Sequence, residues 1–333
     1  MSKNAYLYAV GRVKALETKL LPKSTVERML EAPTAQETLK ILGETAYGIS
    51  FGDTEGVYDF EKVIYSSLRE TYKIIDESTK NPLFSRMSTI RYDFHNLKVL
   101  IKGEYLGDDY QGITMDLGDV PIDRIKRAVS EMDYKDLPPA LKKAGEEAVV
   151  DFELQRDPQR IDIILDKHLF KAIFQMAVEI GHKFAKEMAK TEIDLININI
   201  FIRSRRMGRD ARFLENALLD NGFLEKSLFV ESFNEPLSAL TERLFMGRYG
   251  EIAAEGIQSL EETNSTTVLE RMLDDFLLGE AKKGKYATSG VAPIIGYIKA
   301  KENEGKIIRT VMVGKINNVP ADRIRERLRD VYV

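Results

Sequence analysis

A sequence motif recurs in this chain about every hundred residues, and it occurs three times. The first copy reads YDFHNLKVLIKGEYLG from Tyr92, the second reads IDLININIFIRSRRMG from Ile193, and a degenerate third reads PIIGYIKAKENEGK from Pro293. Two polar residues of the first copy recur in the second: Asp93 and Asn96 return as Asp194 and Asn197. A repeat of this length predicts an architecture of similar units packed side by side.

Two series of apolar residues keep the same spacing outside the motif. One is a leucine that lies 24 residues before each copy, at Leu68, Leu169 and Leu269. The other marks four short modules that follow turns, at Val26, Ile125, Leu224 and Ile324. Because the register holds over most of the chain, the repeat describes the fold and not only a local motif.

The apolar spacing predicts that most of the chain is helical. Between residues 60 and 78, apolar side chains follow the 3.6-residue period of an amphipathic helix. An equivalent helix is predicted from Ile161, and a third over residues 268–278, where Gly279 breaks it. The helix that carries the motif follows each of them, and little β-sheet is expected.

Each helix that carries the motif needs a start signal. Asp93 and Asp194 are predicted to cap the first two, because an Asp ahead of an apolar run accepts hydrogen bonds from free backbone N–H groups, which contributes on the order of 1 kcal/mol. Pro293 serves the third helix, since proline fixes φ in a first turn. The predicted caps of the short helices are Ser24, Asp119 and Asn318.

These elements predict an all-α protein with three quasi-equivalent helical subdomains of about 100 residues each. The approximate units are 1–58 plus 265–333, 59–157 and 158–264, so that the chain starts and ends mid-repeat. A helical unit that cannot bury its apolar stripe alone must stack on its neighbours, which predicts one body over residues 1–333. The units could close around a pseudo-threefold axis or form an open solenoid, and periodicity does not choose between the two.

Composition excludes several classes of protein. With 44% apolar and 31% charged residues among 333, the chain has the balance of a folded protein. Its net charge of −4 provides no global field for nucleic acid. The absence of cysteine excludes a disulfide scaffold and fits a cytoplasmic chain. The most apolar stretch, residues 193–202, has about half the roughly 20 residues of a spanning helix, so any membrane association is expected to be peripheral.

Motifs for catalysis are missing from the sequence. The histidines form no HxxxH or HExxH pair, so we expect neither a metal nor a cofactor; they are His95, His168 and His182. Carboxylates such as Asp274 and Asp275 are expected to lie on solvated faces. We therefore predict that the chain is not an enzyme.

One segment has the spacing of a phosphate-binding loop. It runs from Gly279 to Lys285, but Tyr286 occupies the position of the residue that would bind magnesium, and a helix rather than a strand precedes it. A basic loop is the preferred interpretation of this segment. Nucleotide binding is the alternative, and it depends on Lys285.

The strongest local charge is a group of five arginines that we call the arginine cluster: Arg203, Arg205, Arg206, Arg209 and Arg212. Guanidinium groups favour bidentate contacts with carboxylates or phosphates. On a helix several of the five share one face, which would suit an acidic protein partner. The alternatives are a solvated face paired with Asp210 and Glu215, or nucleic acid, which the acidic chain and the lack of interleaved aromatic residues disfavour.

The motifs together resemble a known family. The C-terminal run from Pro293 to Tyr332 and the two earlier copies of the motif resemble the C subunits of V-type and A-type ATP synthases, which are similar to the d subunit of the eukaryotic V-ATPase. The N-terminal YLYAVGR, from Tyr6 to Arg12, is similar to the start of this family, and the resemblance covers the whole chain. Its most specific part is the combination of Gly296-Tyr297, Lys299, Lys301-Glu302, Arg309 and Gly314-Lys315.

The resemblance implies a non-catalytic connector in the central stalk of a rotary ATPase. In that family three helical subdomains close into a funnel around a pseudo-threefold axis, which is the closed arrangement of the two that periodicity allows. The partners implied are the D and F subunits of the central axle and the proteolipid rotor ring. The complex couples ATP to ion transport, and the connector itself is peripheral to the membrane. The arginine cluster is our hypothesis for one protein interface.

The third copy departs from the other two. It keeps Lys299 in the column of Lys98, but Tyr297 replaces the asparagine, and Asn303 replaces Lys102 and Arg203. The three units are therefore not expected to make identical contacts. The main alternative function is a helical-repeat adaptor outside any rotary ATPase, with a concave face that binds peptides.

Overall fold

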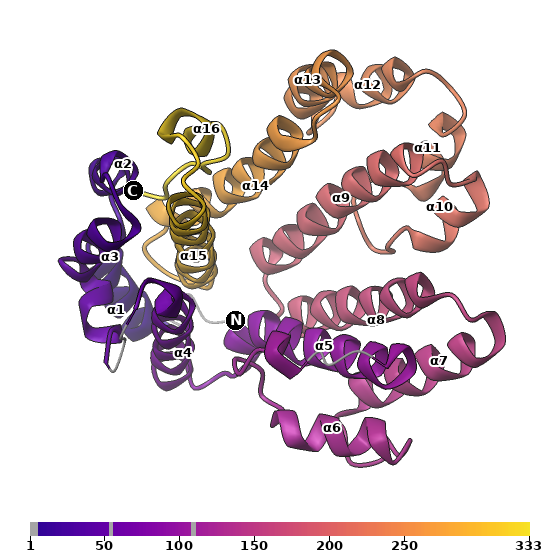
Figure 1. The fold of residues 1–333 in the computed structure, drawn as a ribbon, viewed down its shortest axis with the longest axis horizontal. Helices are drawn as coiled ribbons and strands as arrows, with labels where there is room; N and C mark the ends of the chain where they lie inside the picture. The colour runs from indigo at the N-terminus through magenta and orange to yellow at the C-terminus, as the bar shows by residue number, and fades with distance from the viewer. Residues whose placement is uncertain (1–5, 53–55, 108–110) are drawn as a thin grey trace. The chain divides into compact units, whose positions relative to one another are not determined.

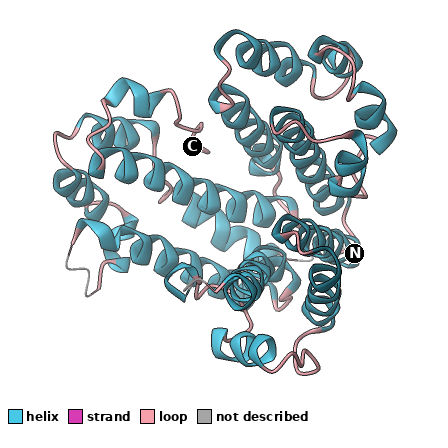
Figure 2. Ribbon diagram, turned by 45° about the vertical axis from the view of Figure 1, so that its right-hand side comes forward, coloured by secondary structure: helices cyan, strands magenta, loops and turns pink. Residues whose placement is uncertain are grey.

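The computed structural model describes residues 6–52, 56–107 and 111–333. Over these ranges the chain forms α-helices joined by short helical turns and loops, and it contains no β-strand (Figures 1 and 2). The predicted all-α class is confirmed. The chain divides into two compact units: unit 1 comprises Met1–Asn81 and Glu235–Val333, and unit 2 comprises Pro82–Asn234.

Unit 1 is built around its longest helix, α15. Most side chains of this helix are buried, and α1, α3, α4 and α14 all pack against it. The α-helices of the unit are α1 (Leu7–Glu17), α2 (Lys23–Glu31), α3 (Ala35–Gly43), α4 (Phe60–Thr79), α12 (Leu237–Phe245), α13 (Gln258–Thr263), α14 (Thr267–Lys282), α15 (Ala292–Ile316) and α16 (Ala321–Arg325). Its short helical segments are η1 (Ala46–Ser50), η2 (Val57–Asp59), η4 (Ile252–Ile257) and η5 (Lys283–Tyr286).

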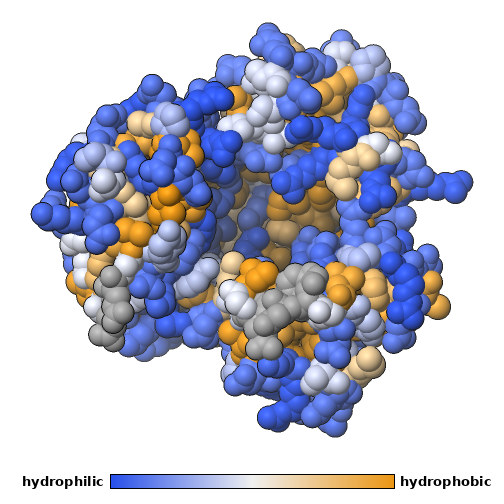
Figure 3. Space-filling view, viewed as in Figure 1, coloured by the Kyte–Doolittle hydropathy of each residue, from blue (hydrophilic) through white to orange (hydrophobic). Residues whose placement is uncertain are grey.

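Unit 2 is a helical bundle in which α5, α7 and α8 pack side by side and α9 packs on α8 (Figure 1). Its α-helices are α5 (Leu83–Leu106), α6 (Ile122–Ser130), α7 (Pro139–Gln155), α8 (Pro158–Glu179), α9 (Lys183–Arg206), α10 (Ala211–Ala217) and α11 (Lys226–Ser232). The short segment η3 (Gln111–Ile113) precedes α6. Figure 3 shows mainly hydrophilic side chains on the visible face of the chain, with apolar groups between them.

The long helices agree with the periodicity except at one boundary. The predicted helix over residues 60–78 is α4, and the one from Ile161 is α8. Pro293 lies in the first turn of α15, as expected. The predicted break at Gly279 is wrong, because α14 continues to Lys282. An interior glycine costs a helix only about 1 kcal/mol, and the packing of α14 on α15 outweighs that cost.

The short helices α2, α6, α11 and α16 each have a buried residue at the same position. The repeat in the sequence predicts this residue correctly in three of the four helices. The fourth residue of each is buried: Val26, Ile125, Phe229 and Ile324. Leu224 is therefore the wrong member of the predicted series, because α11 starts only at Lys226.

The predicted caps of the short helices are also wrong. The residue before α2, α6 and α16 is a proline, and none of these three helices has a side-chain cap. Ser24 lies inside α2, and Asp119 forms an ion pair with Arg86. Asn318 adopts a left-handed conformation with φ of 54° two residues before Pro320. Proline has no N–H and a fixed φ, so it can precede a helix without a capping side chain.

Candidate protein interface

The repeated aspartates lie in the middle of α5 and α9 and not at their starts, so the capping prediction is wrong. Asp93 is buried, and its Oδ1 accepts a hydrogen bond from the backbone N–H of Val120 at 2.9 Å, just before α6. Its Oδ2 lies 2.6 Å from the Arg86 guanidinium. Burial raises the pKa of Asp93, although Val120 N–H and Arg86 both oppose this effect. Asn96 pairs with Met115 through both its amide oxygen and its amide nitrogen, at 2.8 and 2.9 Å.

The second copy makes the same contacts before α11. Asp194 accepts hydrogen bonds from the N–H groups of Phe223 and Leu224, at 3.0 and 3.1 Å. Asn197 exchanges two hydrogen bonds with the backbone of Leu219, at 2.8 and 3.0 Å. These motif residues therefore fix a loop against a long helix, since a buried carboxylate satisfies backbone N–H groups that would otherwise lack partners.

A third acidic side chain has the same function in unit 1. Glu304, in the middle of α15, accepts a hydrogen bond from the N–H of Leu21, two residues before α2. Buried Lys301 lies 2.6 Å from Glu304, and the hydroxyl of Tyr47 donates to Glu304 at 2.9 Å. We call Asp93, Asp194 and Glu304 the loop-anchoring acids. The alignment of the three copies in the sequence matches Ile294, and not Glu304, with Asp93 and Asp194. It therefore places the third copy of the motif too close to the start of α15.

When Glu304 is aligned with Asp93, an ion pair also recurs between the two copies. Lys98 and Arg309 each lie five residues after a loop-anchoring acid. Lys98 lies 3.6 Å from Asp162 of α8, which stands seven residues before Leu169 as Glu61 does before Leu68. Lys98 also pairs with Asp166 at 2.8 Å, and Lys102 pairs with Asp162 at 2.6 Å. In unit 1, Arg309 of α15 forms a bidentate pair with Glu61 of α4, at 2.5 and 2.7 Å. The two units thus hold their long helices together with equivalent contacts.

The arginine cluster lies where α9 ends and α10 begins. Four of its members are exposed and Arg205 is half-buried. The Arg205 guanidinium stacks 5.8 Å from the ring centre of Phe201, and that of Arg209 stacks 4.9 Å from the ring centre of Phe213. Arginines in the last turn of α9 also complement the negative end of the helix dipole. The structure therefore brings the predicted interface residues onto one short exposed segment.

Asp210, one of the alternative partners of the cluster, caps a helix. The side chain of Asp210 accepts a hydrogen bond from the backbone N–H of Phe213 at 2.7 Å and so caps α10. Arg209 donates to the side chain of Gln159 on α8. These contacts fix the turn that presents the cluster.

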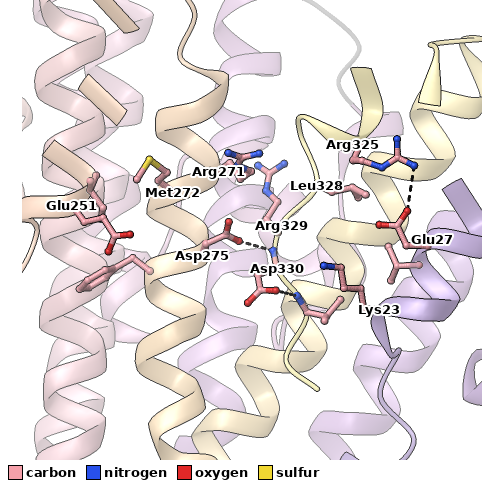
Figure 4. A pocket seen from close by; sticks show the side chains of 14 residues that line it. Lys23, Glu27, Glu251, Arg271, Met272, Asp275, Arg325, Leu328, Arg329 and Asp330 are labelled. Atoms are coloured by element: carbon pink, nitrogen blue, oxygen red, sulfur yellow. Dashed lines mark hydrogen bonds and ion pairs between the residues drawn. The ribbon is translucent and has the colours of Figure 1, made fainter. Parts of the chain in front are cut away.

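A cavity of about 540 Å³ lies in unit 1 between α2, α14 and the chain after α16 (Figure 4). Arg325 closes one side of it through an ion pair with Glu27 at 3.3 Å. On the other side, Asp275 accepts a hydrogen bond from the backbone N–H of Asp330 at 2.7 Å. Cations and anions occur together along its wall, so the cavity has no strong preference for a charged ligand. Its polar side chains hold the C-terminal segment in place.

Asp274 and Asp275 are only half-exposed and bind other groups of the chain, so the prediction that they lie on solvated faces is wrong. Asp274 pairs with Lys306 at 2.6 Å and with Arg329 at 2.9 Å. Burial alone would raise the pKa of Asp274, but the two cations outweigh burial and lower it. Burial raises the pKa of Asp275, against the opposing hydrogen bond from Asp330. Sequence reasoning missed this role because Arg329 is distant in the sequence.

Asp274→Asn is expected to flatten the pH dependence of stability. A carboxyl whose pKa is lower in the folded chain stabilises the fold above its ordinary value of 3.8, and this contribution is lost as the pH falls through the folded pKa. Urea unfolding over a pH series should therefore show a smaller loss of stability below pH 3.8 in the variant than in the wild type. Asp322→Asn, at a side chain that is 91% exposed, is the control. Identical profiles for Asp274→Asn and the wild type would contradict the assignment.

Comparison with known proteins decides the family. The family described as ATP synthase (C/AC39) subunit matches residues 9–327. The chain belongs to this family. The resemblance noted in the sequence is thereby confirmed.

Relatives within the family match almost the whole chain. The C subunit of the V-type sodium ATPase of Enterococcus hirae is 26% identical over 320 residues, which cover 96% of this chain and 97% of the relative. The C subunit of the A-type ATP synthase of Methanocaldococcus jannaschii is 24% identical over 348 residues, 97% of this chain and 86% of the relative. Its counterpart from the A-type ATP synthase of Halorubrum lacusprofundi is 26% identical, and the match covers 96% of each chain.

The histidines and the loop-like segment that the sequence analysis considered as possible sites make structural contacts. His168 contacts Glu147 at 2.8 Å, His95 contacts the carbonyl of Ile113 at 2.9 Å, and His182 caps α9. The segment from Gly279 to Lys285 is helical and forms the end of α14 and most of η5, so it does not form a phosphate-binding loop. No helix in the described ranges combines the length and the apolar character that crossing a membrane requires.

Proposed function

We propose that this member of the C/AC39 family is a non-catalytic connector in the central stalk of a V-type or A-type ATPase. It joins the axle formed by the D and F subunits to the proteolipid rotor ring and transmits torque during ATP-coupled ion transport. The observation that carries the proposal is the family match over residues 9–327, together with relatives from V-type and A-type complexes that match nearly end to end. The chain acts at the cytoplasmic side, peripheral to the membrane.

The internal contacts suit an element that transmits force. A coupling element must not deform much under load, and close-packed helices resist compression. The loop-anchoring acids fix the loops before α2, α6 and α11 to the long helices, which removes flexible connections from the path of force. The equivalent ion pairs of Arg309 and Lys98 favour the three-unit organisation that we propose, with units 1–58 plus 265–333, 59–157 and 158–264 around a pseudo-threefold axis.

The arginine cluster is the proposed contact with an acidic surface of a neighbouring protein in the complex. The backbone of this short, fixed segment loses little conformational entropy on binding, and guanidinium groups form strong contacts with carboxylates. An interface of this kind speeds association and weakens as the salt concentration rises.

A pull-down with the tagged full-length chain, followed by crosslinking, tests both proposals. From the cells that produce the chain, we expect the D and F subunits and the proteolipid to be recovered with the wild type and crosslinked to it. Recovery of none of these proteins would contradict the connector function. The variant Arg203→Glu/Arg206→Glu should recover less of at least one partner than the wild type does. The difference should be larger at low salt than at high salt, where screening weakens the wild-type contact as well.

A matched variant shows whether an effect is specific to the arginine cluster or results from charge reversal in general. Arg124 and Arg127 of α6 are also exposed and also lie three residues apart in unit 2. Reversal of these two charges should leave recovery of all partners unchanged. If the Arg203→Glu/Arg206→Glu variant behaves like this control at both salt concentrations, the arginine cluster is not an interface, whereas the connector function depends only on the wild-type result.

A further inference from the structure

A second cavity in unit 1 has the composition of a small-molecule site. It has a volume of about 520 Å³ and lies between the end of α1, η1, α4 and α15. Ligand sites in proteins are typically about 300–1,000 Å³, mostly apolar, with a few convergent polar groups. This cavity is separate from the charged cavity beside α2 and α14.

Buried polar groups line the cavity from α15 and α4. Tyr297, Lys301 and Thr71 are all at most 6% exposed. The Lys301 ammonium donates to the Tyr47 hydroxyl at 2.9 Å and to Glu304 at 2.6 Å. An ammonium has three N–H donors, so these two oxygens leave one N–H, which has the Tyr47 ring centre 4.0 Å from its nitrogen and no oxygen acceptor among the residues that the structure describes. A ligand acceptor in the cavity would satisfy that donor.

The rim of the cavity carries more positive than negative charge. Lys19, Arg69 and Lys73 line it, and Glu70 is the acidic residue among the lining side chains. Lys19 and Lys73 form no ion pair with any residue in the described parts of the chain. Several cations around a partly enclosed space raise the local concentration of anions. The charge pattern therefore favours an anionic ligand.

Apolar side chains form another part of the wall, beside Ser50, Ser66 and Ser67. Leu16, Leu20 and Ile74 face the cavity, and Ile49 lines it with a side chain that is 91% exposed. Contact with an alkyl chain would remove this apolar surface from water, which stabilises a complex by about 25 cal/mol per Å². An inorganic anion would leave this part of the wall uncovered.

We propose that this cavity binds a small amphipathic anion, a carboxylate or phosphate monoester that carries an alkyl chain. The anionic group contacts Lys301 and the lysines of the rim, and the chain lies against Leu16, Ile49 and Ile74. All of the lining residues belong to unit 1, and none belongs to the arginine cluster.

Calorimetric titration of the full-length chain tests the proposal. Decanoate and decyl phosphate are the probes, with decanol, decylammonium and inorganic phosphate as controls that lack either the anion or the chain. At least one anionic probe should bind, and each control should bind at least about tenfold more weakly. Absence of heat with both anionic probes at two well-separated temperatures, or equal affinity for decanol, would overturn the proposal.

Variants locate the site. Lys19→Gln/Lys73→Gln should weaken binding about tenfold, whereas Lys40→Gln, at an exposed lysine of α3 outside the cavity, should not. The chain contains no tryptophan, so Ile49→Trp adds a single reporter at the cavity, and Met246→Trp adds one at a site that is equally exposed. The probe should change the fluorescence of the first reporter only. Unchanged affinity in the Lys19→Gln/Lys73→Gln variant, or an equal response from both reporters, would refute the site.

Discussion

Glu304→Leu is expected to lower the free energy of unfolding by about 3–5 kcal/mol, because it leaves the ammonium of Lys301 buried without its carboxylate. Lys301 is 6% exposed and Glu304 is 4% exposed, so water reaches the ammonium only from the cavity that Lys301 lines and does not replace the ionic partner. The substitution also removes the acceptor for the backbone N–H of Leu21. Urea unfolding followed by circular dichroism at neutral pH measures the loss.

Two further variants show whether charge burial is the cause. Lys301→Met/Glu304→Leu should recover much of the loss, since an apolar pair can replace a buried ion pair at little cost, but about 1–2 kcal/mol should remain for the unmatched Leu21 and Tyr47 groups. Glu326→Gln breaks an exposed pair with Arg323 at the same i,i+3 spacing and should change stability by less than about 1 kcal/mol. Equal effects of Glu304→Leu and Glu326→Gln would contradict the account.

Gly118→Ala and Gly222→Ala are each expected to destabilise the chain by about 2–4 kcal/mol. A Cβ at either position would lie 2.0 Å from Oδ1 of a loop-anchoring acid, Asp93 or Asp194. The loop would have to move away from the long helix, and the hydrogen bonds to its backbone N–H groups would lengthen or break. Unfolding in urea again measures the effect.

Gly11→Ala is the matched control for these two substitutions. Gly11 lies in the interior of α1, and an added Cβ would meet no atom within 4 Å. Alanine is a better helix former than glycine, so this variant should gain about 0.5–1 kcal/mol. If all three variants changed stability in the same direction by similar amounts, close contact with the acids would not be the reason for glycine at Gly118 and Gly222.

The helices were predictable from the sequence, whereas the contacts that fix the loops were not. Amphipathic spacing identified α4 and α8 because it reflects burial along a single element. The role of Asp93 was missed because its partner Val120 lies 27 residues away, in a loop without regular spacing. An Asp beside an apolar run is equally compatible with a cap and with a buried acceptor, and only the tertiary structure separates the two.

The density of charge in the sequence predicted the candidate interface, but it did not predict the other functional candidates. The five arginines of the cluster lie within ten residues of the sequence, and four of them are exposed in the structure, but their role as an interface stays a prediction. Lys301 and Glu304 were missed as a pair, although a lysine and a glutamate three residues apart in a mostly apolar helix were a usable signal. The rim lysines Lys19 and Lys73 come from different parts of the chain, and their proximity to one cavity depends on the packing of α1 against α4.

The connector function is tested most directly by the amount of ATP-hydrolysing sector that stays on membranes when the gene for this chain is deleted. We expect washed membranes from the deletion strain to lose most of that activity to the supernatant, and re-expression of the wild-type chain to restore both the membrane-bound activity and ATP-driven ion transport. Membranes of the deletion strain that retain a full complement of the sector and pump ions at the wild-type rate would contradict the proposal.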